Sequence, residues 1–307
     1  MNNLPNLKSY FPLAAACVLL LLSGGASAQP PRSDSPAFKP GSLPRSWSPG
    51  GPSCARVAEF QVHSYNDDLY ILRQSGCSHY EKPFLYLLFG RDKVLLLDTG
   101  AGTTGVARTV KGVVDRWLAA HGRASIALIV AHTHAHGDHK GGDDQLKVLP
   151  GATLIAPELG AVRAFFGVQR WPDEIVRYDL GGRVLDVIPI PGHEATSIAV
   201  YDRQTAILFS GDTLYPGRLY IEEPDEFVRS IQRLVDFTRD KPVAHILGAH
   251  IESKRAPYTD YPARTTYQLD EHSLELGRGH LLELNDALTQ RRGRVVRKVM
   301  RDFTISP

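Results

Sequence analysis

The chain has 307 residues, of which 43% are hydrophobic and 22% charged, and its formal net charge is +2. This is globular composition, and the length allows a large hydrophobic core within one α/β domain. A charge so close to zero argues neither for nor against nucleic acid, and no basic run with interleaved aromatic residues is present. Because no such run is present, we expect no nucleic-acid partner.

The N-terminus predicts a signal peptide over residues 1–28. Lys8 supplies a positive start, residues 11–22 form an apolar run, and Ala26-Ser27-Ala28 fits a cleavage site before Gln29. The apolar run is too short to span a bilayer comfortably. We expect a periplasmic or secreted protein without stable membrane association. A lipoprotein signal ending at Cys17 and an uncleaved anchor are the alternatives.

A leader rich in proline, serine and glycine follows over residues 29–54, and we expect it to be poorly ordered unless it packs on the domain. The folded domain, with a helical tail, is predicted over residues 55–307. Of the three cysteines none forms a CxxC pair, so a cysteine-based zinc or thioredoxin-like site is disfavoured. Export implies an oxidising compartment, in which Cys54 and Cys77 either pair or remain separate thiols.

Strand-like runs open the domain. They are predicted at residues 58–63, 69–73, 84–89 and 93–97, separated by turn residues. The last run ends at Asp98, so a buried strand delivers an acid to a sharp turn. Apolar residues at helical spacing then predict a helix over residues 102–120.

The centre of the chain holds a histidine-rich loop directly after an apolar run at residues 126–130. Within nine residues it contains His132, His134, His136, Asp138 and His139. Neutral imidazole binds zinc, copper, iron and nickel, and a neighbouring carboxylate can hold a second ion. Protonated rings this close would repel one another, so the loop is best explained with neutral, metal-bound rings. A polar surface loop that happens to hold histidines is the alternative.

The second half of the chain repeats the pattern of strands and helices. Strands are predicted at residues 152–156, 175–179, 183–189, 198–201, 206–209 and 243–247, and helices at residues 158–166, 225–238 and near 272–290. His193, Asp212 and His250 each follow one of these strands. Two β-rich half-chains that end in helices favour two sheets packed face to face, with helices on both outer sides. The basic residues between 291 and 298 are interpreted as a solvated helix face.

Five short motifs, in a fixed order along the chain, resemble those of a known protein family. They are Asp98-Thr99-Gly100, His134-Ala135-His136-Gly137-Asp138-His139, Pro191-Gly192-His193, Ser210-Gly211-Asp212 and Gly248-Ala249-His250. The second is the HxHxDH motif, and over residues 58–252 the sequence resembles the metallo-β-lactamase superfamily. The resemblance implies a four-layer αββα sandwich with a two-metal site along one sheet edge.

The same resemblance implies a set of metal ligands. One ion would take His134, His136 and His193, the other would take Asp138, His139 and His250, and Asp212 would bridge the pair. Two divalent ions are expected, with zinc as the default and iron or manganese as alternatives. Asp138 is also the candidate catalytic residue, which would orient the bridging water and carry a proton to the leaving group.

Further residues are assigned by their position around these motifs. Asp98 and His132 are expected to support the ligands from behind, and His245, inside the last strand, is interpreted as a sheet histidine. Candidate substrate contacts are Tyr215, Arg218, Tyr220 and Trp171; packing is the alternative role for these aromatic side chains.

The identity of residue 212 separates the members of the family. Zinc β-lactamases usually carry Cys or Ser at that position. An Asp there resembles glyoxalase II, lactonases, phosphodiesterases, nucleases and related hydrolases. The resemblance therefore implies an exported dinuclear hydrolase acting on an ester, thioester, lactone or amide-like bond of a small molecule. A zinc β-lactamase and a metal-binding or ligand-sensing module without turnover are the alternatives. Substrate and oligomeric state are not predicted.

Overall fold

The computed structural model describes residues 38–290 and 294–307. One compact unit runs from Pro36 to Pro307. The predicted signal peptide with its cleavage site, Cys17, the start of the leader and the arginines at 291 and 292 lie outside the described residues. Within the described ranges, no helix is long and apolar enough to cross a bilayer.

The first sheet has six strands in sequence order. They are β1 (Phe60–Asn66), β2 (Leu69–Gln74), β3 (Phe84–Phe89), β4 (Lys93–Leu97), β5 (Ala127–Ala131) and β6 (Ala152–Leu154). Strands β1 to β4 form an antiparallel meander, whereas β4, β5 and β6 run parallel. The change to parallel pairing occurs where α1 (Val106–Ala120) connects β4 to β5, because a parallel pair needs a crossover connection.

The second sheet has six strands in the order β13-β12-β10-β9-β8-β7. They are β7 (Val176–Asp179), β8 (Val184–Pro189), β9 (Ile198–Asp202), β10 (Ile207–Gly211), β12 (His245–Gly248) and β13 (Glu275–Leu276). Its one parallel pair joins β10 to β12, and α4 (Pro224–Phe237) lies between them in the chain. Each sheet therefore contains a parallel pair connected through a helix.

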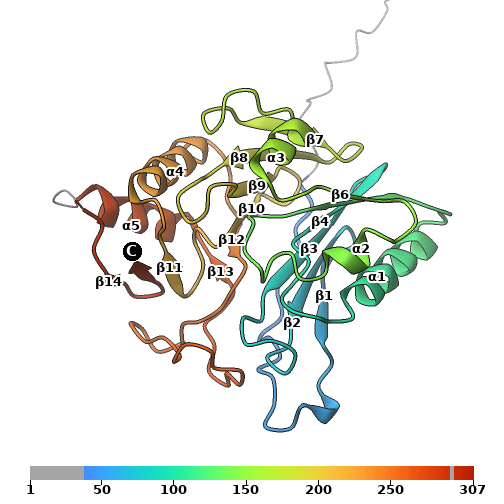
Figure 1. The fold of residues 1–307 in the computed structure, drawn as a ribbon, viewed down its shortest axis with the longest axis horizontal. Coiled ribbons are helices and arrows are strands. Elements are labelled where there is room, and N and C mark those ends of the chain that lie inside the picture. The colour runs from blue at the N-terminus through green and yellow to red at the C-terminus, as the bar shows by residue number, and fades with distance from the viewer. Residues whose placement is uncertain (1–37, 291–293) are drawn as a thin grey trace, which may run out of the picture. The chain divides into compact units, whose positions relative to one another are not determined.

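Helices cover the outer face of each sheet, which confirms the αββα sandwich (Figure 1). On the first sheet, Val110 and Trp117 of α1 pack in one cluster with Leu87 and Leu96. On the second sheet, α4 and α5 (Arg278–Thr289) pack in one cluster with β8, β9, β10 and β12. Helix α4 is amphipathic, and its apolar stripe is buried while Asp225, Arg229 and Asp236 are exposed.

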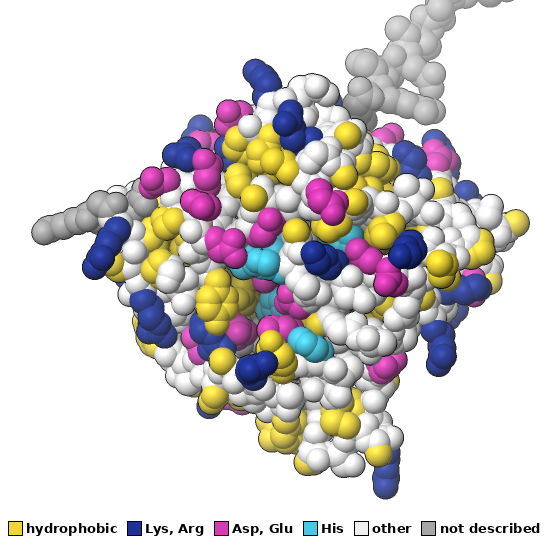
Figure 2. Space-filling view, in the orientation of Figure 1, with side chains coloured by type: hydrophobic (Ala, Val, Ile, Leu, Met, Phe, Trp, Pro, Cys, Tyr) yellow, Lys and Arg dark blue, Asp and Glu magenta, His cyan; other side chains and the backbone are white. Residues whose placement is uncertain are grey.

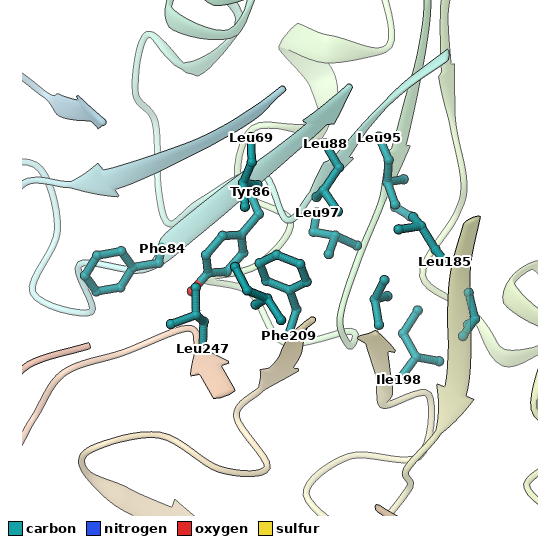
Figure 3. Packing of buried hydrophobic residues seen from close by; sticks show 14 of the residues in the cluster. Leu69, Phe84, Tyr86, Leu88, Leu95, Leu97, Leu185, Ile198, Phe209 and Leu247 are labelled. Atoms are coloured by element: carbon teal, nitrogen blue, oxygen red, sulfur yellow. The ribbon is translucent and has the colours of Figure 1, made fainter. Parts of the chain in front are cut away.

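The main core lies between the sheets (Figure 3). Strand β3 shows how it is built, because its side chains alternate in direction. Phe84, Tyr86 and Leu88 point toward the second sheet, where the fully buried Phe209 of β10 meets them. The intervening Leu85 and Leu87 pack on the α1 side. Both faces of β3 are thus buried, as its uninterrupted apolar sequence predicts.

Helix α3 (Leu159–Phe166) matches the predicted helix at residues 158–166. Five short elements are not predicted, because segments of two to four residues have no readable periodicity. They are η1 (Cys54–Arg56), α2 (Asp143–Leu146), β11 (Arg218–Tyr220), β14 (Lys298–Val299) and β15 (Thr304–Ser306). The helix expected near residue 272 begins at Arg278, because the residues just before it pair with β12 as β13.

The leader packs on the folded unit in its described part. The Ser42 amide donates to the Tyr65 carbonyl at 2.9 Å, and the buried Trp47 ring meets the Phe84 ring edge-on. Cys54 and Cys77 form a disulfide, so of the two alternatives the bridge is the one present. The end of the leader is thereby tied to the loop between β2 and β3.

Candidate metal centre

Two of the parallel strand pairs, β4 with β5 and β10 with β12, bring the predicted motifs together. Leu97 at the end of β4 lies opposite Ala131 at the end of β5, so Asp98 and the histidine loop leave the first sheet side by side. In the second sheet, Gly211 lies opposite Gly248, which sets Asp212 beside the loop that carries His250. Parallel strands have their carboxyl ends at one edge, and both sheets contribute that edge to one site.

Two close backbone approaches join these loops. The Ile198 amide donates to the Thr133 carbonyl at 2.8 Å, which links the second sheet to the histidine loop. Gly211 has φ of +52°, and a Cβ there would lie 2.8 Å from the Thr133 Cβ. Gly192 has φ of +135°, and its Cβ would lie 2.3 Å from the Phe227 backbone. Both positions therefore require glycine, and each precedes a predicted ligand.

The first ligand cluster consists of three imidazole nitrogens. Nε2 of His134 lies 3.2 Å from Nε2 of His193, and Nδ1 of His136 lies 3.0 and 3.1 Å from these two atoms. Around a tetrahedral zinc ion with bonds of about 2.0–2.1 Å, ligand nitrogens lie about 3.3 Å apart. The triangle is therefore close to the size that zinc requires.

The second ligand cluster combines two histidines with two carboxylates. Nε2 of His250 lies 3.3 Å from Oδ2 of Asp138 and 3.4 Å from Oδ2 of Asp212. Nε2 of His139 lies 3.5 Å from Oδ1 of Asp212 and 3.6 Å from Oδ2 of Asp138. All four ligand atoms lie within 4.8 Å of one another, as they also do in the first cluster.

Asp212 lies between the two clusters. Its Oδ2 atom is 3.7 Å from Nε2 of His193 and 4.0 Å from Nε2 of His134, while both of its oxygens approach the second cluster. A single carboxylate therefore faces both groups of ligands. This is the position that a bridging ligand needs.

The polar atoms of the site fit a metal better than they fit one another. Nε2 of His139 and Oδ1 of Asp212 are buried and have no hydrogen-bond partner among the described residues. An unsatisfied buried polar group is costly, and such a group at a site of His and Asp indicates a ligand position. The donor set of five imidazoles and two carboxylates suits zinc, iron or manganese.

Each histidine is oriented from behind through its other ring nitrogen. Nδ1 of His193 donates to the Tyr220 carbonyl at 2.8 Å, and Nδ1 of His250 donates to the Glu81 carbonyl at 2.9 Å. His136, which turns Nδ1 toward the cluster, has its Nε2 3.2 Å from a Glu222 oxygen. Such partners hold the tautomer and the ring direction that a metal ligand needs.

The two clusters differ in the proton affinity of their histidines. Burial lowers the pKa of His134 well below its usual value, and it also lowers the pKa of His193. Both rings are consequently neutral, which is the form that binds metal. For His139 and His250 burial acts in the same direction, but the surrounding carboxylates outweigh it and raise both pKa values well above the usual range.

The pKa values of Asp138 and Asp212 are lowered, in the direction opposite to those of His139 and His250. Burial alone would raise the pKa of Asp138, but His139 and His250 outweigh it and lower the pKa to about 2. The same two histidines lower the pKa of Asp212 well below its usual value despite complete burial. The second cluster therefore carries two ionised carboxylates at neutral pH, the form that coordinates a cation.

The structure also locates the supporting histidines. His132 is buried outside both clusters, with Nε2 2.9 Å from Oδ1 of Asp143. His245 is half-buried at the start of β12, and its ring lies edge-on to Tyr65, 6.1 Å away. Neither ring belongs to the two ligand clusters. His132 instead anchors α2, which follows the histidine loop.

A cavity of about 440 Å³ opens over the ligands. It is lined by Glu81, His136, Asp138, His193, Asp212, Tyr215, Tyr220, Ile221, Glu222, His250, Glu252, Ser306 and Pro307. Figure 2 shows histidine side chains in a depression of this face, with acidic side chains around it. Tyr215 and Tyr220, two of the predicted substrate contacts, are thus in its wall.

Several residues of the cavity wall are not predicted from the sequence, and one predicted substrate contact lies outside the wall. Glu81 and Glu222 carry no motif, and Ser306 reaches the cavity because β15 pairs with β11 about 85 residues away in the chain. Trp171 packs against the core between the sheets and does not line this cavity. Plain packing, the alternative for Trp171, describes its contacts.

Comparisons with known proteins agree with this geometry. A family model described as the metallo-beta-lactamase superfamily matches residues 83–261. A hydroxyacylglutathione hydrolase of Pseudomonas putida is 38% identical over 128 residues, which are 40% of this chain and 48% of that protein. The acyl-coenzyme A thioesterase MBLAC2 of Bos taurus is 26% identical over 230 residues, 64% of this chain and 82% of the relative.

The fold has counterparts among solved structures. A metallo-beta-lactamase from Pontibacter korlensis superposes with a TM-score of 0.51 at 18% identity, covering 76% of this chain and 100% of that one. At this identity the likeness concerns the fold alone. The chain spans about half the length of the Pseudomonas relative that it matches.

Proposed function

Because this chain belongs to the metallo-β-lactamase superfamily, we propose that it is a dinuclear metal-dependent hydrolase that cleaves the thioester bond of a small acyl-thiol. One observation carries the proposal. The carboxylate of Asp212 faces two separate ligand clusters at the floor of an open cavity, with oxygens 3.4 Å from His250 and 3.7 Å from His193. A bridged pair of ions is the arrangement that this geometry supports best.

We assign the ligands of the two ions as the resemblance implies. His134, His136 and His193 would hold one ion, and Asp138, His139 and His250 the other, with Asp212 shared. When bound, such a pair supplies a hydroxide nucleophile at neutral pH and polarises the substrate carbonyl. Zinc is the default metal, and iron or manganese would also suit these ligands.

The remaining chemistry belongs to the chain itself. The Asp138 carboxylate lines the cavity with 19% of its side chain exposed, and its Oδ2 atom is held 3.3 Å from His250. From this position it would orient the attacking water and carry a proton to the leaving group. Tyr215 is buried with its hydroxyl 3.2 Å from Glu252, so it would form a rigid wall against the substrate.

The choice of a thioester rests on the relatives. The two curated names, hydroxyacylglutathione hydrolase and acyl-coenzyme A thioesterase, both describe acyl groups carried by a thiol. These names favour a thioester over an ester, lactone or amide-like bond. Asp212 disfavours the zinc β-lactamase alternative, because that class usually has Cys or Ser at the bridging position.

Export is part of the proposal. The Cys54–Cys77 disulfide supports it, because disulfides persist in secreted and periplasmic proteins and are rare in the cytosol. The predicted signal peptide gives the route. We therefore propose a periplasmic or secreted enzyme.

The test combines metal content with turnover. Purified protein is analysed for metal per chain and assayed on acyl-glutathione and acyl-coenzyme A thioesters, an aryl ester, a lactone and nitrocefin, before and after chelation. We expect about two ions per chain and thioester hydrolysis that chelation abolishes and zinc restores. Faster nitrocefin hydrolysis would favour the β-lactamase alternative. Two bound ions without any turnover would favour a sensing module, and one ion would refute the bridging role of Asp212.

A further inference from the structure

A second cavity of about 240 Å³ adjoins the metal cavity. Its walls share Glu81, Tyr220 and Glu252 with the metal cavity, so the two cavities are neighbours. The rest of the wall consists of Tyr80, Lys82, Arg218, Pro262, Ala263, Arg264, Thr265 and Gln268. Three cationic residues line this small space, Lys82, Arg218 and Arg264.

Lys82 is an ammonium held at the wall without a carboxylate contact. It is 5% exposed, and its Nζ donates to the carbonyls of Tyr80 at 2.6 Å and Thr265 at 2.7 Å. An ammonium has three N–H donors, and no third partner for Nζ occurs in the described part of the chain. One donor therefore remains available to a ligand in the cavity.

Arg264 is the second cation without a carboxylate partner. Its guanidinium carbon lies 4.7 Å from the centre of the Tyr80 ring, and no ion pair of this side chain occurs within residues 38–290 and 294–307. Arg218 differs, because its Nη2 donates to Glu252 at 2.8 Å and its Nη1 to the Tyr261 carbonyl at 2.9 Å. Arg218 and Glu252 thus neutralise each other. The wall also holds the Glu81 carboxylate, which forms no ion pair with Lys82 or Arg264 among the described residues, so both cations remain for a ligand.

The backbone at both cations is in an unusual conformation. Lys82 has φ of +51° and Arg264 has φ of +65°, in the left-handed region that residues other than glycine rarely adopt. Such residues cluster at ligand-binding sites, where the surrounding structure holds them in place. Three further described residues share this conformation, Asp98 at the metal centre and Ala206 and Tyr258 away from both cavities.

We propose that the cavity between Lys82 and Arg264 binds a carboxylate of the substrate while the carbonyl that is hydrolysed lies in the metal cavity. A planar guanidinium matches the two oxygens of a carboxylate, and the ammonium adds a point charge. The cavity is smaller than the roughly 300–1,000 Å³ of pockets for drug-sized ligands, so its size suits a carboxylate-bearing chain end. The inference rests on the proposed thioesterase function and specifies its substrate as a small acidic acyl-thiol.

The test compares thioesters that differ only in where a carboxylate lies. The metal-loaded protein is assayed on acetyl-N-acetylcysteamine, which is neutral, on S-acetyl-3-mercaptopropionate, with a carboxylate on the thiol side, and on glutaryl-N-acetylcysteamine, with one on the acyl side. We expect kcat/KM for one acidic thioester to exceed the neutral value about tenfold, as one charge-assisted contact would give. The side that carries the favourable carboxylate identifies which half of the substrate enters the second cavity.

Variants then assign the effect to the cavity. Arg264→Gln should lower kcat/KM about tenfold more for the favoured acidic thioester than for the neutral one, Arg264→Lys should retain part of the preference, and Arg116→Gln, on the exposed face of α1, should have no effect. Equal rates on all three thioesters, or an equal loss on all three in Arg264→Gln, would overturn the inference. The inference would also be overturned if Arg264→Gln lowered the hydrolysis of acetyl-coenzyme A by the same factor as the hydrolysis of the favoured acidic thioester. Absence of any thioester turnover would instead refute the proposed function.

Discussion

The carboxylate of Asp98 lies 3.0 Å from Nδ1 of His139, and both side chains are completely buried. Asp98 also accepts a hydrogen bond from the Thr133 amide at 2.7 Å, so one acid at the end of β4 holds both the backbone and a ligand of the histidine loop. The ring of His139 is thereby aimed with Nε2 toward the second cluster. The acid after β4 acts on a ligand about forty residues later in the chain.

Asp98→Asn should weaken the second metal position. The substitution removes the charge that supports the His139 ring, and loss of such a partner typically costs about 10–100-fold in metal affinity. Zinc binding measured by competition with a chelator tests this. Asp186→Asn is the matched control, because Asp186 is also buried but pairs with Arg203 away from the site. Equal affinities in the wild type and Asp98→Asn would contradict the positioning role.

His136→Ala and His245→Ala should differ sharply. His136 belongs to the first cluster, whereas His245 contacts Tyr65 and no ligand atom. We expect His136→Ala to lose a metal ion and nearly all activity, and His245→Ala to keep both ions. Metal per chain by plasma mass spectrometry and kcat/KM on a thioester provide the measurements. Equal metal loss in the two variants would show that the ligand set is wrong.

Metal affinity should rise with pH. In the metal-free protein the carboxylates raise the pKa values of His139 and His250 well above 6.5, so both rings hold protons that a metal ion must displace. Release of two protons corresponds to at most about a 100-fold gain in affinity per pH unit. Chelator competition at several pH values measures it. Affinity independent of pH would rule out proton displacement.

The stability of the metal-free protein should fall as pH rises, whereas its metal affinity should rise. A raised folded-state pKa contributes stability that is fully present below the unfolded value of about 6.5 and is lost as pH rises through the folded value. The free energy of unfolding, measured in urea, should therefore decrease as pH rises above about 6.5. A zinc-saturated sample serves as the control, and it should not show this loss.

Removal of the disulfide should destabilise the protein and loosen the second metal position. Replacement of Cys54 and Cys77 by serine frees a loop whose ends are 23 residues apart, at a typical cost of about 2–4 kcal/mol. The loop leads to Glu81, whose carbonyl accepts a hydrogen bond from His250. Urea unfolding and zinc competition provide the readouts, and treatment of the wild type with reductant should reproduce both changes. Unchanged stability would show that the bridge adds nothing to the fold.

Phe209→Ala should test the core between the sheets. Phe209 is completely buried on β10, and its ring centre lies 4.6 Å from that of Tyr86. Truncation of a buried phenylalanine costs about 3–5 kcal/mol, because a cavity remains. Val148→Ala is the control, since Val148 is 72% exposed and should change stability by less than about 0.5 kcal/mol. A similar loss in both variants would place the stabilising core elsewhere.

The sequence by itself determined the long elements and pointed to the His and Asp residues that the structure gathers in the candidate metal centre. Strand-like runs of four to seven residues located the strands of both sheets except β13, and a helical period located α1 and α4, because burial on one or both faces leaves a local pattern. The ligand types and their placement after strands were readable for the same local reason. The αββα arrangement followed from two half-chains that each end in helices, together with five ordered motifs.

Only the tertiary structure decided what surrounds the metal site. The choice between a disulfide and two thiols for Cys54 and Cys77, the carbonyl of Glu81 behind His250, and the entry of Ser306 into the cavity wall depend on contacts between distant segments. The pairing of Lys82 with the loop near Arg264 is of the same kind. Such contacts leave no local period in the chain, because they are set by how strands pair and loops meet, and they therefore appear only once the chain is folded.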